Sequence, residues 1–269
     1  MKFLTKKTIR YFIGLSIIFY LSSLAFLYYN QEKFFFNPKI LESTYNYTFE
    51  GDFEEYNIKV DAKNTLNTLL FKCNSPKGVV LYLHGNAGAL HDWGLRAPLY
   101  TQNNHDVLFV DYRGYGKNKN TIENEVMLHQ DMQVVYNFLK TKYDEKDITI
   151  LGFSIGSGLA AKLAANNKPK QLILEAPYYS FESLINRIVP IVPRFLINYK
   201  IKTHLFLKDV HCPITIFHGK NDQLISPKHN AIPLSKIKPN STLHLIENCN
   251  HNGIYRSDFY SNKLQELLD

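Results

Sequence analysis

Cysteine is scarce in this chain of 269 residues, with only Cys73, Cys212 and Cys249 present. This odd, widely spaced set lacks metal-ligand spacing, so we expect neither a disulfide scaffold nor a metal site and interpret the three as small buried hydrophobic residues. Internal repeats and low-complexity tracts are also missing. The apolar content of 45% against 20% charged residues excludes a disordered chain, and the length allows one large domain or two small ones.

The excess of positive charge is local. The chain carries 31 Lys and Arg against 24 Asp and Glu, a net charge of +7. Four of the basic residues precede residue 11 and five lie within residues 187–208, which leaves 22 basic and 24 acidic residues elsewhere. A basic protein can bind nucleic acid, a membrane surface or acidic substrates. Because the remainder of the chain is nearly neutral, we expect no nucleic-acid partner.

Residues 11–29 form a run of 19 residues without charge. About 20 apolar residues let a helix cross the hydrocarbon core of a bilayer, and the two tyrosines that end the run suit its interface. A cleaved signal peptide is the alternative, but its apolar part is shorter and needs a small-residue cleavage site. We predict a single-pass anchor over residues 1–30. The basic N-terminus then lies in the cytoplasm and the catalytic domain on the non-cytoplasmic side.

Short apolar runs alternate with longer helical patterns in the rest of the chain. Continuous runs such as VVLYL and LILEA are typical of strands covered on both faces, as in parallel sheets. The alternation predicts a doubly wound α/β domain over residues 55–269, joined to the anchor by a juxtamembrane linker at 31–54. The predicted strands are 56–60, 65–71, 78–83, 106–111, 148–152, 171–175, 213–218 and 242–246, and the predicted helices are 122–142, 157–166 and 254–268.

Residues 183–208 depart from this alternation of strands and helices, because two prolines interrupt helix-like pieces between two predicted strands. We predict an inserted cap at about residues 178–210, over the carboxyl edge of the sheet. Apolar residues interleave there with Lys and Arg, which suits contact with a lipid headgroup region and entry of a fatty acyl chain. Inward packing with solvated charges is an equally open alternative.

A G-x-S-x-G sequence spans residues 152–156, directly after a predicted strand. A nucleophile on a tight strand-to-helix turn requires glycine two positions to either side, because larger side chains would collide. The following helix directs its N–H groups toward an oxyanion near Ser154. A surface turn is the alternative, but the strand before and the small-residue helix after favour a nucleophilic Ser154.

A serine nucleophile requires a base and an orienting acid, which should follow it in the chain order serine, acid, histidine. Asp222 comes after the predicted strand 213–218, and His251 comes just before the last helix. We therefore predict Ser154, Asp222 and His251 as a catalytic triad. The competing residues are Glu175 for the acid and His218, His229 and His244 for the base.

A second loop rich in small residues, HGNAG at residues 84–88, follows the predicted strand 78–83. Small residues let the backbone approach a substrate carbonyl, so we predict the backbone N–H groups of Asn86 and Ile155 as an oxyanion hole. A plain strand-to-helix turn is the alternative. The sequence DYRGYG at residues 111–116 is assigned a structural role.

Five sequences in order, HGNAG, DYRGYG, GFSIG, HGKND and NHNG, resemble the α/β-hydrolase superfamily. More narrowly, they are similar to its membrane-anchored serine-hydrolase branch, which contains protein depalmitoylase-like proteins and bacterial relatives. The resemblance covers about residues 55–268 and implies an α/β-hydrolase fold with the same triad and oxyanion donors. The chain departs from the family's usual residues at 89–90 and 117–120.

The expected reaction is hydrolysis of carboxylic esters or acyl thioesters through an acyl-enzyme, with no cofactor and no metal. The expected partners are a small-molecule or lipid-like acyl substrate and the membrane, contacted by residues 11–29 and by the cap in its lipid-facing alternative. A serine aminopeptidase on the same fold and a non-catalytic scaffold are the alternative functions. Five basic residues and no acid within 183–208 argue against a site for a free amino group.

Overall fold

The computed structural model describes residues 5–269, whose main sheet has the strand order β10-β9-β8-β7-β4-β6-β3-β2. Only the β2–β3 and β3–β6 pairs of this sheet are antiparallel, which confirms the predicted mostly parallel, doubly wound fold. Its strands are β2 Phe53–Lys59, β3 Thr65–Phe71, β4 Gly78–Leu83, β6 His105–Val110, β7 Ile148–Phe153, β8 Gln171–Glu175, β9 Ile214–Gly219 and β10 Ser241–Ile246.

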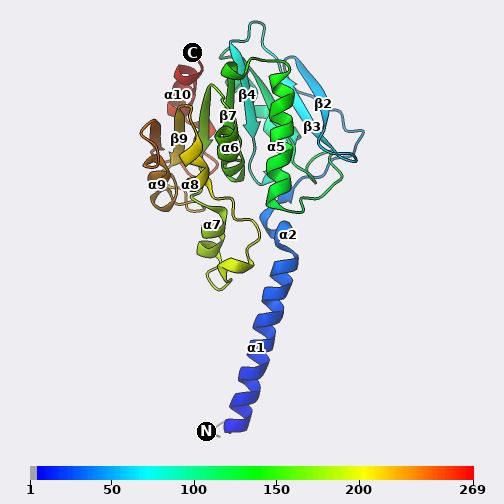
Figure 1. Cartoon of the computed structure of the whole chain (residues 1–269), viewed down its shortest axis with the longest axis vertical. Coiled ribbons are helices and arrows are strands. Elements are labelled where there is room, and N and C mark those ends of the chain that lie inside the picture. The colour runs from blue at the N-terminus through cyan, green and yellow to red at the C-terminus, as the bar shows by residue number, and fades with distance from the viewer. Residues whose placement is uncertain (1–4) are drawn as a thin grey trace.

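Helices cover both faces of this sheet (Figure 1). One hydrophobic core lies between the sheet and α5 (Glu125–Lys140) with α6 (Ile155–Asn166). The other lies beneath α10 (Asp258–Leu268) and the short helices α3 (Leu90–Trp93) and α4 (Pro98–Thr101). The central strands β4, β6, β7, β8 and β9 are buried at every residue. Burial on both faces explains why these strands read as continuous apolar runs.

Several predicted boundaries were wrong by one to three residues. β2 begins at Phe53 because that residue pairs with Phe71 at the end of β3. The predicted helix 122–142 is shorter in the structure, because the side chain of Asn124 caps it by accepting the Met127 N–H. The strands predicted at 106–111 and 213–218 are each displaced by one residue, to His105–Val110 and Ile214–Gly219. The last predicted helix is divided into a 3-10 turn at Ile254–Arg256 and α10.

The cysteines are only partly as predicted. Cys249 is buried, whereas Cys73 and Cys212 are half-buried, and all three are free thiols. Cys73 and Cys212 lie near the ends of strands, where packing is less complete than between the helices and the sheet.

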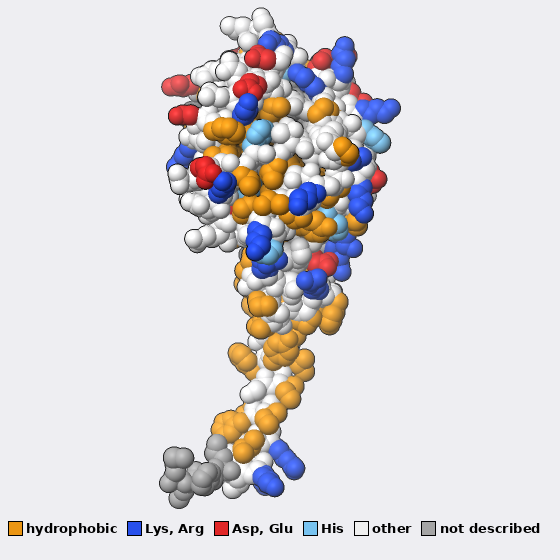
Figure 2. All heavy atoms as spheres, turned by 90° about the vertical axis from the view of Figure 1, so that its left-hand side faces the viewer, with side chains coloured by type: hydrophobic (Ala, Val, Ile, Leu, Met, Phe, Trp, Pro, Cys, Tyr) orange, Lys and Arg blue, Asp and Glu red, His pale blue; other side chains and the backbone are white. Residues whose placement is uncertain are grey.

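Helix α1 (Lys6–Tyr29) projects away from the domain (Figure 1). An 18-residue stretch of it has a mean hydropathy of 1.8 and is only 6% buried, so the helix is long and apolar enough to cross a membrane. Hydrophobic side chains cover α1, and Lys and Arg lie toward its far end (Figure 2). Residues 1–4 of the predicted anchor lie outside the described residues.

The segment after α1 packs directly onto the domain. It contains α2 (Gln31–Phe35) and β1 (Asn37–Pro38), which pairs in parallel with β5 (Ala87–Gly88) of the HGNAG loop. The side chains of Phe36 and Tyr47 are buried in the two cores. The division of the chain into a linker at 31–54 and a domain from residue 55 stays a prediction. In the structure, residues 31–47 pack against the domain.

The segment between β8 and β9 contains α7 (Phe181–Ile188), a 3-10 turn at Arg194–Leu196 and α8 (Thr203–Phe206). Its second half packs on α6, with Tyr199, Ile201 and Leu207 buried in the core beneath the sheet. Its first half, residues 181–197, projects at the end of the domain from which α1 emerges (Figure 1). We use "cap" below for residues 181–197.

Arg113 in the loop after β6 ties that loop to α5. Its guanidinium donates to both carboxylate oxygens of Asp131, at 2.6 and 2.8 Å, and both side chains are buried. We expect Arg113→Met to destabilise the protein by about 3 kcal/mol or more, because it leaves the Asp131 carboxylate buried without its partner. Denaturant unfolding of the full chain in detergent measures the change.

The exposed pair Lys146–Asp144, at 3.6 Å, provides the matched control. Lys146→Met should change stability by less than about 1 kcal/mol, because solvent screens an exposed ion pair. Equal effects of the two substitutions would contradict the role assigned to Arg113.

Candidate active site

Ser154 occupies a strained turn between β7 and α6. Its backbone has φ 52° and ψ −119°, a conformation that residues other than glycine rarely adopt. A Cβ atom on Gly156 would lie 2.1 Å from the carbonyl oxygen of Leu83, and one on Gly152 would lie 2.5 Å from that of Gly156. Both glycines of the G-x-S-x-G sequence are therefore required by close backbone packing, which was the reason given for them from the sequence.

The structure brings together the three predicted triad residues from three different loops. The Ser154 hydroxyl lies 3.1 Å from Nε2 of His251, and Nδ1 of His251 lies 2.7 Å from Oδ2 of Asp222. A carboxylate only accepts hydrogen bonds, so Nδ1 carries the proton in this arrangement. Nε2 is then free to accept the Ser154 proton, as a general base must.

Close approach of two loops holds the acid and the histidine together. The Asn221 N–H after β9 donates to the Cys249 carbonyl after β10, at 2.9 Å. A Cβ atom on Gly219 would lie 2.3 Å from that same Cys249 oxygen. Glycine at the end of β9 therefore allows the Asp222 loop and the His251 loop to pack against each other.

Asp222 is buried and surrounded by donors. Its Oδ1 accepts the N–H groups of Leu224 and Ile225, at 2.9 and 2.8 Å. Burial raises the pKa of Asp222, but hydrogen bonds from His218 and His251 and from the backbone outweigh burial and hold the pKa well below its ordinary value. Asp222 is therefore charged at neutral pH and can stabilise a protonated His251.

His218 is a neighbour of Asp222 that sequence reasoning considered only as a competing base. Its Nε2 lies 3.2 Å from Asp222 Oδ2 and 2.6 Å from the Ile225 carbonyl, so Nε2 carries a proton and donates to both. The i, i+4 spacing of His218 and Asp222 was visible in the sequence. Their contact could not be predicted, because the turn after β9 brings the two side chains together.

The side chains of the other residues considered as the acid or the base lie outside the hydrogen-bond chain of the triad. Glu175 accepts a hydrogen bond from Tyr260 and lies 3.7 Å from Arg96, and burial raises the pKa of its carboxyl group. His244 stacks on Phe217 within the second core, and His229 is exposed in a 3-10 turn. The geometry thus brings Asp222 rather than Glu175 to His251.

The HGNAG loop is supported from below by the DYRGYG loop. Tyr112 donates to the His84 carbonyl and Tyr115 to the Asn86 carbonyl, each at 2.8 Å. The Asn86 carbonyl also accepts the Asn37 N–H of β1, at 2.8 Å. The predicted oxyanion donors Asn86 and Ile155 line the same cavity as Ser154. The structural role assigned to DYRGYG agrees with these contacts.

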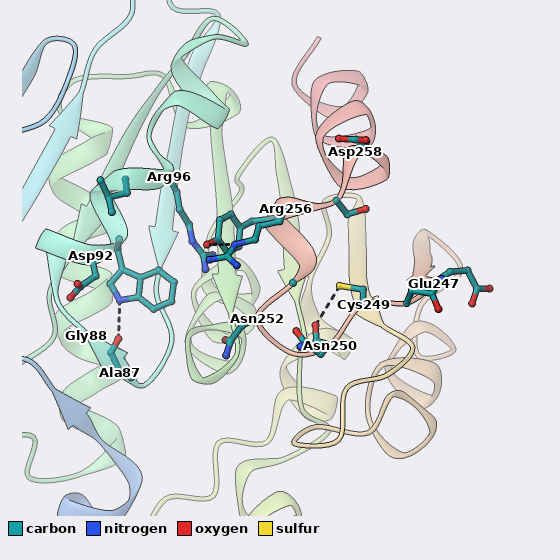
Figure 3. A pocket seen from close by; sticks show the side chains of 16 residues that line it. Ala87, Gly88, Asp92, Arg96, Glu247, Cys249, Asn250, Asn252, Arg256 and Asp258 are labelled. Carbon is teal, nitrogen blue, oxygen red and sulfur yellow. Dashed lines mark hydrogen bonds between the residues drawn. The ribbon is translucent and has the colours of Figure 1, made fainter.

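Two different cavities lie on either side of the triad. A cavity of about 870 Å³ is lined in part by charged side chains of both signs, with Arg96 and Arg256 lying between Asp92 and Asp258 (Figure 3). The Phe153 ring contacts both regions, since it lies 5.1 Å from the Arg96 guanidinium and 5.2 Å from the His251 ring. Ser154 instead lines a cavity of about 260 Å³ whose lining side chains are uncharged and mainly apolar.

The wall of this apolar cavity includes residues that sequence reasoning missed. Phe34 and Phe35 come from α2, in the segment predicted as a linker. Leu184, Ile185 and Val189 come from the cap. The aromatic run FFF beside the predicted anchor was the available signal, but only the fold shows that it reaches Ser154. Within residues 5–269, no three His, Cys, Asp or Glu side chains form a group that could hold a metal ion.

A mostly parallel sheet with a serine on the strand-to-helix turn and a histidine before the last helix defines an α/β hydrolase. A sequence-family model described as serine aminopeptidase, S33, matches residues 74–208, half of the chain. The chain belongs to this family of α/β hydrolases, which confirms the superfamily resemblance seen in the sequence.

Proteins from other organisms have sequences similar to this chain. Protein bem46 of Schizosaccharomyces pombe is 26% identical over 238 residues, which cover 82% of this chain and 78% of the relative. Lysophosphatidylserine lipase ABHD12 of Mus musculus is 27% identical over 227 residues, which cover 72% of this chain. The chain spans only 56% of the length of that lipase.

Solved structures share the fold. The Pyrococcus furiosus esterase Pf2001 has a TM-score of 0.69 at 19% identity, over 86% of this chain and 98% of its own. A bromoperoxidase from Bacillus anthracis has a TM-score of 0.64 at 16% identity, over 80% of this chain and 99% of its own. At these identities the likeness shows the fold alone.

The lowered pKa of Asp222 predicts a pH-dependent contribution to stability. A carboxyl group whose pKa falls on folding stabilises the protein above its unfolded pKa, near 3.8, and this contribution is lost as pH falls through the folded value. We expect the difference in unfolding free energy between the wild type and Asp222→Asn to narrow as pH falls from 6 toward 3. Denaturant unfolding at several pH values measures it, and a constant difference would contradict the expectation.

Proposed function

We propose that this protein is a membrane-anchored serine hydrolase that cleaves carboxylic esters or acyl thioesters. The observation that carries the proposal is the continuous hydrogen-bond chain from Ser154 through His251 to Asp222, at 3.1 and 2.7 Å, beside an apolar cavity. These three groups in this order have the chemistry of nucleophile, base and orienting acid.

The reaction proceeds in two halves. His251 Nε2 takes the Ser154 proton while Oγ attacks the substrate carbonyl, and the Asp222 carboxylate stabilises the imidazolium that forms. The tetrahedral oxyanion accepts the backbone N–H groups of Asn86 and Ile155, the latter at the first residue of α6. Collapse of the tetrahedral intermediate then expels the alcohol or thiol, which leaves with a proton donated by His251. Water then attacks the acyl-enzyme carbonyl and gives a proton to His251. Collapse of this second tetrahedral intermediate breaks the bond to Ser154 Oγ, which takes the proton back from His251 as the acid is released.

The apolar cavity favours an acyl group as the part of the substrate next to Ser154. Its lining side chains come from α2, the cap and the loop after β9, and they are mainly Phe, Leu, Ile and Val. Burial of each methylene group of an acyl chain in such a cavity contributes about 0.8 kcal/mol. Two proteins similar to this chain are named as a lipase and an esterase, which agrees with this class of substrate.

A serine aminopeptidase is the second candidate, favoured by the description of the matching family. Such an enzyme must bind the free α-amino group of its substrate, and a buried ammonium group requires a carboxylate partner. The cavity at Ser154 is instead lined by uncharged side chains. Ester or thioester hydrolysis therefore fits the site better.

The placement of the protein follows from α1. Its uncharged run has basic residues at its N-terminal end, so the positive-inside rule places that end in the cytoplasm and the catalytic domain on the other side. The predicted anchor over residues 11–29 and the active site are joined through α2, whose Phe34 and Phe35 line the cavity at Ser154.

Substitution of the nucleophile tests the chemistry. We expect Ser154→Ala to lower kcat/KM for acyl esters at least about 10³-fold and to abolish labelling by a fluorophosphonate, because both need Oγ. The substrates are matched acyl esters, acyl thioesters and amino-acid amides. Ser261→Ala on α10, remote from the site, serves as the control and should retain labelling. Faster cleavage of amides would favour the aminopeptidase, and labelling that survives in Ser154→Ala would refute the assigned nucleophile.

Protease protection tests the orientation. In sealed vesicles with the cytoplasmic face outward, we expect added protease to leave residues 55–269 intact and to digest them once detergent opens the vesicles. A tag placed before residue 1 should be removed in both conditions. Digestion of the domain in sealed vesicles would reverse the assigned topology.

A further inference from the structure

A second apolar cavity lies directly beside the one that holds Ser154. It has a volume of about 120 Å³ and runs between the C-terminal part of α1 and the cap. Phe34, Phe35, Ile185 and Val189 line both cavities. The two spaces therefore share a wall of four apolar side chains, and together they extend from the surface of α1 to the Ser154 hydroxyl.

The outer end of this path is formed by the predicted membrane segment itself. Leu24 and Leu27 of α1 line the second cavity and are half-buried, whereas most side chains of this helix are exposed. With residue 20 at the centre of the uncharged run, Leu24 lies about 6 Å and Tyr28 about 12 Å from the midplane. Both positions are within the roughly 15 Å half-thickness of the hydrocarbon core.

The cap reaches the same depth. Tyr20 of α1 donates a hydrogen bond to the Ile191 carbonyl of the cap, at 2.8 Å. Ile188, Ile191 and Phe195 of the cap are 51, 66 and 77% exposed. Hydrophobic side chains continue from α1 onto the adjoining end of the domain (Figure 2). An exposed apolar cap beside a membrane helix suits insertion into the hydrocarbon.

We infer that these two cavities form a passage through which the acyl chain of a lipid ester enters laterally from the bilayer and reaches Ser154. The inference rests on the proposed function, and it assigns the substrate class as an ester or thioester whose chain resides in the membrane. The occupant is an acyl chain because the path is apolar along its length, begins at hydrocarbon depth and ends at the proposed nucleophile. Such an entry avoids transfer of the chain through water, which costs about 0.8 kcal/mol for each methylene group.

The experiment uses the full-length protein in phosphatidylcholine vesicles and two p-nitrophenyl esters, the water-soluble acetate and the membrane-resident palmitate. We expect Leu27→Trp, which fills the outer cavity, to lower the palmitate-to-acetate ratio of kcat/KM about tenfold or more, the effect of excluding about two methylene groups. Leu15→Trp places the same indole elsewhere on α1 and should leave the ratio unchanged. An unchanged palmitate-to-acetate ratio in Leu27→Trp would overturn the inference of a passage.

A second readout does not depend on turnover. A palmitoyl probe with a diazirine on its chain, added to vesicles that contain Ser154→Ala, should crosslink to α2 and the cap, and Leu27→Trp should suppress these crosslinks. Crosslinks confined to the outer face of α1 would overturn the inference. If the wild type hydrolyses neither ester and resists fluorophosphonate labelling, the proposed function fails, while the crosslinks still decide whether the passage binds a chain.

Discussion

The close approach of the turn after β7 to the end of β4 is the constraint on which the site depends. Only a glycine at 156 lets α6 begin against the Leu83 carbonyl, and this packing imposes the positive φ of Ser154. The same contact brings the first N–H of α6 beside the HGNAG loop. Ser154 and the N–H groups of Asn86 and Ile155, the proposed nucleophile and oxyanion donors, are thus positioned by backbone packing, which does not vary with side-chain rotamers. The strain at Ser154 persists because the surrounding sheet and helix are buried.

Buried polar groups supply the second level of organisation. Asp222 accepts four hydrogen bonds in a site closed to solvent, and the loops after β9 and β10 contact each other through Gly219. The Asp111–His84 contact, at 3.4 Å, and the two tyrosines of DYRGYG support the opposite loop. The Asp222 carboxylate, as the hydrogen-bond partner of Nδ1, gives the His251 imidazole its tautomer and orientation. Each polar interaction at the site therefore positions either the base or the oxyanion loop.

The segment after α1 connects this helix to the candidate site. β1 pairs with the HGNAG loop, and α2 contributes two phenylalanines to the cavity at Ser154. The cap closes the same cavity from the other side and extends beside α1. The two cavities consequently differ: the one toward α1 is lined by uncharged, mainly apolar side chains, and the one at Arg96 and Arg256 is lined in part by charged side chains of both signs.

The sequence by itself determined the sheet and the order of its elements along the chain, because burial periodicity is a local pattern. From the G-x-S-x-G and HGNAG loops it also predicted the residues of the candidate site. Even so, helix and strand ends were displaced where a cap or a cross-strand pair defines them, as at Asn124 before α5 and at Phe53 in β2. Only the tertiary structure decided that Asp222 rather than Glu175 meets His251, that His218 supports the acid, and that residues 31–36 build the site. These are contacts between segments far apart in the chain, and local pattern carries no information about their distances.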